Sequence, residues 1–484
     1  MKKLFAAFTA AFLLFNASSG LRAQDLETGY FLGGNPFAFR LNPAFQSERG
    51  IFSIALGGTG LGVWSNLGVN TLLYPDTATG DLYTFMNDRV PSAEFLGKIG
   101  KNNSINIDAN VNLLTLGFWS KDSFYTVDLN VRTINGISVP YDYFNFLKQG
   151  TAATSTFDLS GMGIRSKTFA EAAFGWSRNY DDKFSLGFRV KALVGAEEAE
   201  AIVSRASMQM DENLWEVKAE GYMNASSPSV SIKRDENGYL DFDSIQFKEG
   251  VYGPAGYGAA VDLGFSWNVI PDLTLSGAIL DLGTIRWNRE VKGISPETSY
   301  TWTPSDGEQV SEETINQETE KMVEALSGIF RYQDVSSTGS GVFEMLPFRV
   351  HLGAEYRMPF YDRLSVGALY MGRGGSCFAR HAGRLSLNWN PLNFLSLSTG
   401  TTLNRFGESL GFALNLHPAG INLLIGCDYI PLSVVKIGPW IEDIPAEYRD
   451  YAVIPTGQMK LNLYLGLNLA IGRRHLDHAR RFRW

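Results

Sequence analysis

The sequence predicts an all-β protein, a single closed antiparallel transmembrane β-barrel of about 14 strands, with 16 strands as the alternative. Three observations predict this fold: an N-terminal export signal with no membrane-spanning helix after it, a repeated alternation of apolar with small or polar residues, and connections that are short and long in turn. The composition agrees, since 19% of residues are charged, 13% are aromatic and 50 are glycine. This mixture suits many strands joined by tight turns.

Residues 1–23 are expected to form a signal peptide. Lys2 and Lys3 precede the apolar stretch Leu4–Phe15, and the small residue Ala23 offers a cleavage point. The apolar stretch is too short to cross a bilayer as a helix, and no later run of eighteen apolar residues follows. We therefore expect an exported protein without a helical anchor.

Residues 24–50 are expected to form an N-terminal periplasmic or plug segment. Gly33-Gly34-Asn35-Pro36 and Asn42-Pro43 are turn-forming sequences, which favour an irregular path over a helix or strand.

Residues 51–472 are expected to form the barrel. In the last segment, leucines at every second position from 461 to 469 alternate with small or polar residues, so that one face of the strand is wholly aliphatic. The same pattern predicts fourteen strands at 51–60, 104–119, 123–134, 168–178, 183–194, 257–268, 273–285, 347–357, 364–373, 383–389, 394–403, 408–416, 421–430 and 458–472.

The connections predict which end of each strand faces which side of the membrane. Connections after the even-numbered strands are short, as at Lys121-Asp122, whereas those after the odd-numbered strands are usually long, as at 61–103 and 135–167. Short periplasmic turns and long extracellular loops alternate in this way in bacterial barrels. The stretch 195–256 departs from the rule, and we interpret it as an extension of the fifth strand, an excursion and a return, with an added hairpin as an open alternative.

Two loop helices are predicted, at 141–148 and 311–329. The first follows Pro140 and ends at Gly150, and the second has Ser311 as a cap with acidic residues in its first turn. Each helix packs either on the barrel rim or in the lumen, and the rim is the interpretation that we favour.

A soluble β-sandwich or solenoid is the rival fold, because it also alternates apolar and polar residues. Its wet face would carry much Lys and Glu, whereas the polar face here is mainly Gly, Ser, Asn, Ala and Thr. Small residues suit a barrel lumen, and the aliphatic face suits lipid. The barrel is therefore the better prediction.

Charged residues on the inward face are the candidate site residues. Such charges either pair and hold a barrel rigid, which is the interpretation that we favour, or line a hydrated path for a solute. The candidates that the alternation places in the lumen are Asp128, Arg132, Glu171, Arg189, Lys191, Asp262, Arg349, His351, Glu355 and Arg357.

Motifs of catalysis and of metal or cofactor binding are not found in the sequence. The five histidines are scattered, and the chain has no Walker loop, nucleophile elbow or dinucleotide fingerprint. We therefore expect no enzyme activity, no cofactor and no metal. The formal charge of −8 argues against a nucleic-acid partner. The expected partners are outer-membrane lipid, the barrel assembly machinery and a small solute or a secretion partner.

The basic end of the chain, residues 473–484, is expected to be a periplasmic tail. It is either solvated or in contact with lipid headgroups or a periplasmic protein.

Three local patterns carry a family resemblance: Asn42-Pro43-Ala44 before the first strand, Asp281-Leu282-Gly283 after a strand, and the short hairpins that lead to the leucine-rich final strand. The chain resembles an outer-membrane barrel family of unknown function found in Bacteroidota, which is similar in plan to the long-chain fatty-acid transporter barrels and to the barrel shuttle of type IX secretion. The resemblance implies a fourteen-stranded barrel whose segment 24–50 tucks into the lumen. Such a segment acts as a hatch in the fatty-acid transporters.

Two functions follow as hypotheses. The barrel passes a small, apolar solute or has an accessory role in export. The alternative is a structural or surface-interaction barrel with a plugged lumen, which transports nothing.

Overall fold

The computed structural model describes residues 25–75, 82–150, 156–181, 183–210, 214–247, 253–288, 291–303, 317, 321, 331–336, 341–374, 380–404, 407–430, 434–436, 453–455 and 458–472. The expected signal peptide (1–23) and basic tail (473–484) lie outside the described residues, as does nearly all of the helix expected at 311–329.

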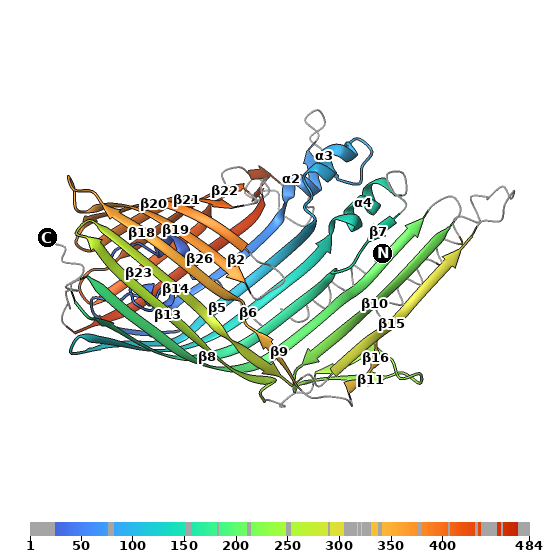
Figure 1. The fold of residues 1–484 in the computed structure, drawn as a ribbon, viewed down its shortest axis with the longest axis horizontal. Coiled ribbons are helices and arrows are strands. Elements are labelled where there is room, and N and C mark those ends of the chain that lie inside the picture. The colour runs from blue at the N-terminus through green and yellow to red at the C-terminus, as the bar shows by residue number, and fades with distance from the viewer. Residues whose placement is uncertain are drawn as a thin grey trace, which may run out of the picture.

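The fold is a closed antiparallel barrel of fourteen strands, as predicted (Figure 1). The ring closes where the last strand pairs with the first, and β1 and β2 together form that first strand. In order around the ring the wall consists of β1 (Gly50–Ile54) with β2 (Gly57–Gly68), β5 (Asn102–Ser120), β6 (Ser123–Pro140), β8 (Gly163–Asn179), β9 (Phe184–Met210), β13 (Gly256–Ile270), β14 (Leu273–Trp287), β18 (Phe348–Arg357) with β17 (Val342–Met345), β19 (Leu364–Gly374), β20 (Arg380–Leu392), β21 (Leu395–Asn404), β22 (Gly407–Leu416), β23 (Ile421–Ile430) and β26 (Gln458–Ile471).

The strands alternate as the sequence pattern predicts, with the aliphatic face outward. In β26, Leu463, Leu465, Leu467 and Leu469 are 37–61% exposed, whereas Asn462, Tyr464 and Asn468 between them are at most 3% exposed. A closed ring leaves no strand edge in the wall, so its backbone polar groups are paired while its apolar side chains face outward. This is the arrangement that a membrane requires.

Short turns gather at one end of the barrel, which we call the turn end; the opposite end is the loop end. The β5–β6 turn has only two residues, and Lys121 adopts a positive φ of 54° there. The β18–β19 and β22–β23 turns, 358–363 and 417–420, have the predicted bounds.

One side of the barrel continues far beyond the other (Figure 1). β9 runs for 27 residues, and β10 (Trp215–Ser226) pairs with its far half while β13 pairs with its near half. β15 (Val291–Trp302) continues β14 and pairs with β10. The described parts of residues 195–256 are thus a strand extension and a return with the added hairpin, formed by β11 (Val230–Arg234) and β12 (Leu240–Phe247), and they leave the ring at fourteen strands. We call β10, β15 and the adjoining far parts of β5, β6, β8 and β9 the loop-side sheet.

Helices and short strands pack against the loop-side sheet. The expected helix at 141–148 is present as α4 (Tyr141–Gln149), whereas α2 (Val69–Leu72) and α3 (Ser92–Gly97) were not predicted. Phe95 and Phe144 lie at the centre of their apolar cluster. No helix among the described residues is both long and apolar enough to span a membrane. The remaining short elements are β3 (Leu73–Pro75), β4 (Leu82–Thr84), β7 (Thr156–Asp158), β11 (Val230–Arg234), β12 (Leu240–Phe247), β16 (Gln333–Asp334), β24 (Val434–Lys436) and β25 (Val453–Pro455).

The first wall strand differs from its prediction as one continuous strand at 51–60. It is interrupted at 55–56, where Ala55 has a φ of 61°, and Gly58 just after the break has a φ of 94°. The register against β26 shifts between Gly57 and Thr59. The interruption is a bulge in the wall. The Gly57 and Gly58 carbonyl groups at this bulge accept hydrogen bonds from Arg40, which lies inside the barrel.

Candidate functional site: a plugged lumen

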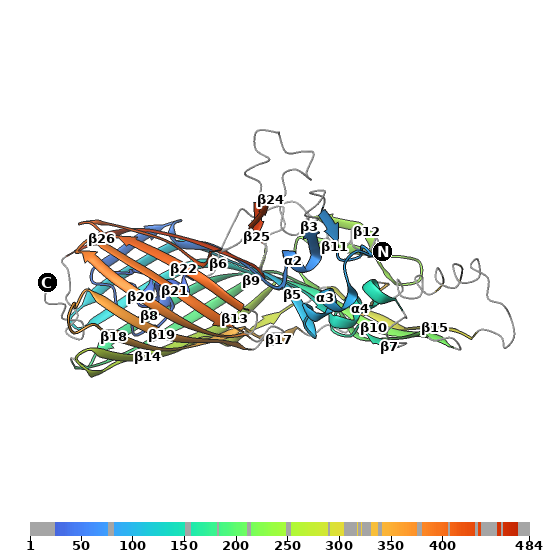
Figure 2. The ribbon, with the colours of Figure 1, turned by 90° about the horizontal axis from the view of Figure 1, so that it is seen from above.

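Residues 25–49, which we call the plug segment, lie inside the barrel (Figure 2). Their path is irregular, with single 3₁₀ turns at η1 (Glu27–Gly29) and η2 (Ala38–Arg40). Leu26, Phe37 and Phe39 join one buried cluster with wall residues, and Tyr30 and Phe31 join another. The plug segment therefore supplies much of the apolar core of the lumen.

Glycines in the wall make room for the plug segment. Gly187 on β9 and Gly264 on β13 lie directly opposite each other. A Cβ at Gly187 would be 2.1 Å from the Pro43 carbonyl oxygen, and one at Gly264 would be 2.1 Å from Asn42 Oδ1. The wall is shaped to this segment, since any side chain at either position would collide with it.

The Asn42-Pro43-Ala44 motif thus has a structural role. Asn42 Nδ2 donates to the Phe265 carbonyl at 3.0 Å, and Asn42 Oδ1 accepts from the Ala44 N–H at 3.0 Å. The asparagine side chain fixes the local turn and anchors it to β13.

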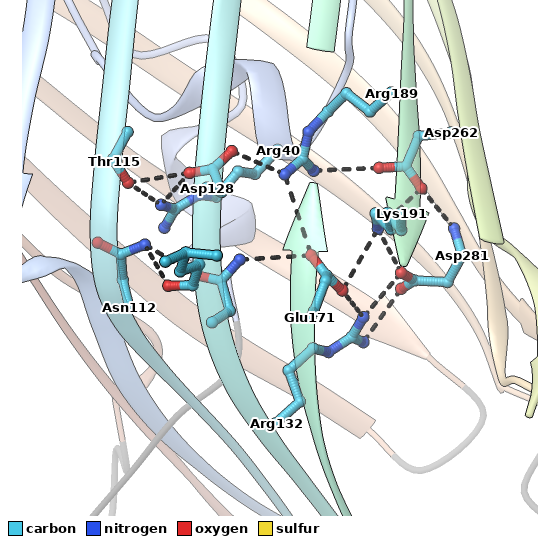
Figure 3. Close-up of polar contacts among 12 residues, drawn as sticks. Arg40, Asn112, Thr115, Asp128, Arg132, Glu171, Arg189, Lys191, Asp262 and Asp281 are labelled. Atoms are coloured by element: carbon cyan, nitrogen blue, oxygen red, sulfur yellow. Dashed lines mark hydrogen bonds and ion pairs between the residues drawn. The ribbon is translucent and has the colours of Figure 1, made fainter. Parts of the chain in front are cut away.

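Buried ion pairs join the plug segment to the wall (Figure 3). Arg40 Nη2 lies 2.8 Å from Asp128 Oδ1 on β6, and Arg189 Nη2 on β9 lies 2.9 Å from Asp128 Oδ2. Arg40 also donates to Thr115 Oγ1 at 2.6 Å and, at the bulge of the first strand, to the Gly57 carbonyl at 2.6 Å. Asp128 is fully buried, so its charge depends on these two guanidinium groups.

A second carboxylate, Asp281, forms ion pairs with three cationic side chains. It lies within 2.7 Å of Arg132, 2.5 Å of Lys191 and 3.1 Å of Arg349. The register between β13 and β14 shifts next to Asp262, and Asp281 has a φ of 61° there, which aspartate tolerates better than most residues. Its N–H donates to Asp262 Oδ1 at 2.7 Å. This bulge lets Asp281 face inward directly after the buried Leu280.

The ten-residue ion network that results is electrically neutral. Its five cations are balanced by five anions, with Asp25 of the plug segment 2.9 Å from Arg349. The members are Arg40, Arg132, Arg189, Lys191 and Arg349 with Asp25, Asp128, Glu171, Asp262 and Asp281.

Seven of the ten residues that the sequence nominated belong to this network: Asp128, Arg132, Glu171, Arg189, Lys191, Asp262 and Arg349. His351 is buried elsewhere, with its Nδ1 2.9 Å from the Leu41 carbonyl oxygen of the plug segment. Glu355 accepts a hydrogen bond from Ser365, and Arg357, the last residue of β18, donates its N–H to the Asp272 carbonyl at 2.8 Å.

Asp25, Arg40 and Asp281 were missed by the sequence reasoning. Asp281 lies at a bulge that strict alternation does not show, although the Asp281-Leu282-Gly283 motif marked the place. Asp25 and Arg40 precede the first strand and belong to no alternating pattern.

The charge state of Asp25 is set by its surroundings. Burial disfavours its ionised form, but the neighbouring Arg349 and the more distant Arg40 outweigh this effect and lower the pKa of the carboxyl below its ordinary value. Asp25 is therefore ionised at neutral pH and holds the plug segment to β18.

A separate anchor holds the beginning of the plug segment. Asp428 on β23 accepts hydrogen bonds from the Glu27 N–H at 3.1 Å and the Thr28 N–H at 2.5 Å. Arg384 lies 3.3 Å from the same carboxylate. Residues 400 positions apart in the sequence are thereby joined.

A small polar cavity lies beside the plug segment. A cavity of about 40 Å³ is lined by Asp25, Arg132 and Arg349 of the network and by Asp108 and Arg373 of the wall. A cavity that binds benzene has about 150 Å³, so this space is too small for benzene. Within the part of the chain that the structure describes, no group of three or more His, Cys, Asp or Glu side chains could hold a metal ion.

A family model described as a family of unknown function (DUF5723) matches residues 43–428. No curated protein sequence matches the chain. Among solved structures, the chain is similar to the toluene transporter TbuX of Ralstonia pickettii, at 9% identity over 90% of this chain and 94% of that chain, with a TM-score of 0.40. A FadL homologue of Pseudomonas aeruginosa matches at 12% identity over 93% and 99%, with a TM-score of 0.38. A mutant of the TodX monoaromatic hydrocarbon channel matches at 11% identity over 90% and 94%, with a TM-score of 0.42. At these TM-scores, nothing about a ligand of this chain follows from the likeness.

Proposed function

The chain belongs to the family of unknown function DUF5723, and we propose its role from the geometry of the structure. The protein is a barrel of the bacterial outer membrane that its own plug segment keeps closed. It acts by presenting the loop-side sheet to a partner outside the cell. The turn end then faces the periplasm and the loop end faces the exterior. The outward aliphatic faces contact outer-membrane lipid, and the barrel assembly machinery inserts the chain.

The observation that carries the closed state is the occupied lumen. The plug segment fits glycines of the wall and is tied to the wall by the neutral ion network, and the polar cavity beside it has a volume of about 40 Å³. Breaking one member of a buried ion pair costs roughly 3–5 kcal/mol, because the remaining charge is left uncompensated. Departure of the plug segment would separate Arg40 from Asp128 and Asp25 from Arg349, so the closed state is favoured.

The loop-side sheet supports the surface role. A strand crosses a membrane with about 9–11 residues, and β9 has 27. The excess of about 16–18 residues is roughly 55 Å long at about 3.3 Å per residue. Side chains such as Arg205, 78% exposed, stand on this projection. The partner that we propose is an exported protein that binds to the loop-side sheet.

A second candidate is gated passage of a small solute. The cavity next to the plug segment is lined by charged side chains, which favours a polar solute over an apolar one because unpaired buried charges are costly. Passage would require the plug segment to move.

Liposome swelling with the purified full chain tests the closed state. We expect sugars and amino acids to enter no faster than they enter protein-free vesicles, with an open porin as the positive control. Uptake at porin-like rates would contradict the proposal.

Site-specific photocross-linking in intact cells tests the surface role. A photoreactive residue at position 205 should form a discrete adduct with a second protein. The matched control at Leu463, which is 61% exposed on the lipid-facing side of the barrel, should not. Equal patterns at the two positions would count against a partner at the loop-side sheet.

A further inference from the structure

Two ion pairs join wall strands that are far apart on the ring and use no residue of the plug segment. Asp108 on β5 pairs with Arg373 on β19, and Lys167 on β8 pairs with Glu344 on β17. In the fourteen-strand ring, β5 and β19 are seven positions apart in either direction, the greatest separation that such a ring allows.

An open circular barrel could not form the first of these pairs. Fourteen strands about 4.8 Å apart and tilted by about 40° enclose a circle of about 28 Å diameter. An arginine and an aspartate side chain together do not reach across such a distance. The wall is therefore flattened where Asp108 and Arg373 meet.

An apolar cluster lies beside these pairs, because Ile134 packs against it and also lines the cavity of Asp108 and Arg373. Trp287 is 1% exposed and packs with Phe169, Leu193 and Ile285 of the wall strands and with Leu346, which lies between β17 and β18. A Cβ at Gly195 would be 2.3 Å from the Trp287 ring, so the wall makes room for the indole as it does for the plug segment.

We infer that the wall closes the lumen a second time, on the loop side of the plug segment, so that release of the plug segment alone does not open a path. The wall constriction consists of the Asp108–Arg373 and Lys167–Glu344 pairs and the Trp287 cluster. The polar cavity lies between the two closures, since Asp25 of the plug segment and Asp108 and Arg373 of the wall share its lining. This inference goes beyond the proposed function, because it concerns the wall and stands whether or not the loop-side sheet has a partner.

Chemical cross-linking of the full chain tests the flattened wall. With Cys377 and Cys427 replaced by serine, the double variant D108C/R373C should be bridged in most molecules by a short bifunctional thiol reagent, giving a shifted band on a denaturing gel. The control variant D108C/Y370C uses the same two strands, but Tyr370 is 41% exposed on the outer face and should remain unbridged. Failure to bridge D108C/R373C, or equal bridging of both variants, overturns the inference.

Single-channel conductance tests the second closure itself. R40M weakens the plug segment, D108A/R373A weakens the wall constriction, and the triple variant weakens both. We expect the triple variant to conduct at least tenfold more than either of the others. A triple variant that conducts no more than R40M overturns the inference, whether R40M is open or closed. The swelling assay on the unmodified chain decides the closed state separately.

Discussion

Replacing Arg40 by methionine should loosen the plug segment without changing the wall. Methionine keeps much of the length of the side chain but removes its charge, its 2.8 Å ion pair with Asp128 and its 2.6 Å hydrogen bond to Gly57. Both members of the pair are at most 4% exposed, so solvent screens the interaction little. Loss of one partner of a buried pair costs roughly 3–5 kcal/mol. At about 1.4 kcal/mol for each factor of ten, the open population should rise between about a hundredfold and a few thousandfold.

Thiol labelling measures this population. Ala44 is 3% exposed in the plug segment, so in A44C, with both native cysteines replaced, the maleimide reaction rate reports how often the segment leaves its place. We expect R40M to raise this rate at least a hundredfold, whereas R205M, which removes an exposed arginine from the loop-side sheet, should leave it unchanged. Heat-modifiable mobility on gels verifies that each barrel is folded. A folded R40M barrel that labels within twofold of its parent would refute the role given to the ion network.

Three further outcomes are expected. G264V should keep the plug segment from its place in the lumen and should raise the rate of A44C labelling, because a Cβ there would lie 2.1 Å from Asn42 Oδ1. The control G383V should leave that rate unchanged, because nothing lies within 4 Å of a Cβ at this wall glycine. L465R should lower barrel stability in denaturant titrations by up to about 2–4 kcal/mol, depending on depth in the bilayer, because it buries a charge in lipid; an unchanged midpoint would argue that this face is not in the membrane. The pKa of Asp25 is lowered, so its contribution is fully present above its ordinary pKa of about 3.9 and is lost as the pH falls further through the lowered value. The A44C labelling rate, divided by the rate of a free thiol at the same pH because only the thiolate reacts, should therefore be flat between pH 7 and pH 5, and a rise of this ratio within that range would contradict the assignment.

Much of the fold could be predicted because strand alternation and turn sequences are local. The leucines of β26, the two-residue turn at Lys121-Asp122 and the α4 helix are each specified by a few neighbouring residues. The errors arise where the backbone leaves the regular pattern. The first strand is broken near Ala55, and Asp281 faces inward because of a bulge.

The candidate site could be predicted only as a set of inward-facing charges. Alternation nominated Asp128 and Arg189 as lumen residues, but it could not indicate that one plug arginine would lie beside Asp128. His351 and Glu355 satisfied the same pattern, but the structure places them against Leu41 and Ser365. Facing the lumen is a property of one strand, whereas pairing depends on the position of each strand on the ring.

The sequence by itself determined that the chain would form a closed ribbon with an aliphatic outer face, because side chains alternate with a period of two and the turns are encoded locally. Only the tertiary structure decided that Thr28 would meet Asp428 and that Asp108 would meet Arg373. The physical reason is that closing the ring and flattening it bring together residues hundreds of positions apart, and these distances follow from the sum of all registers and bulges around the wall, which no single segment contains.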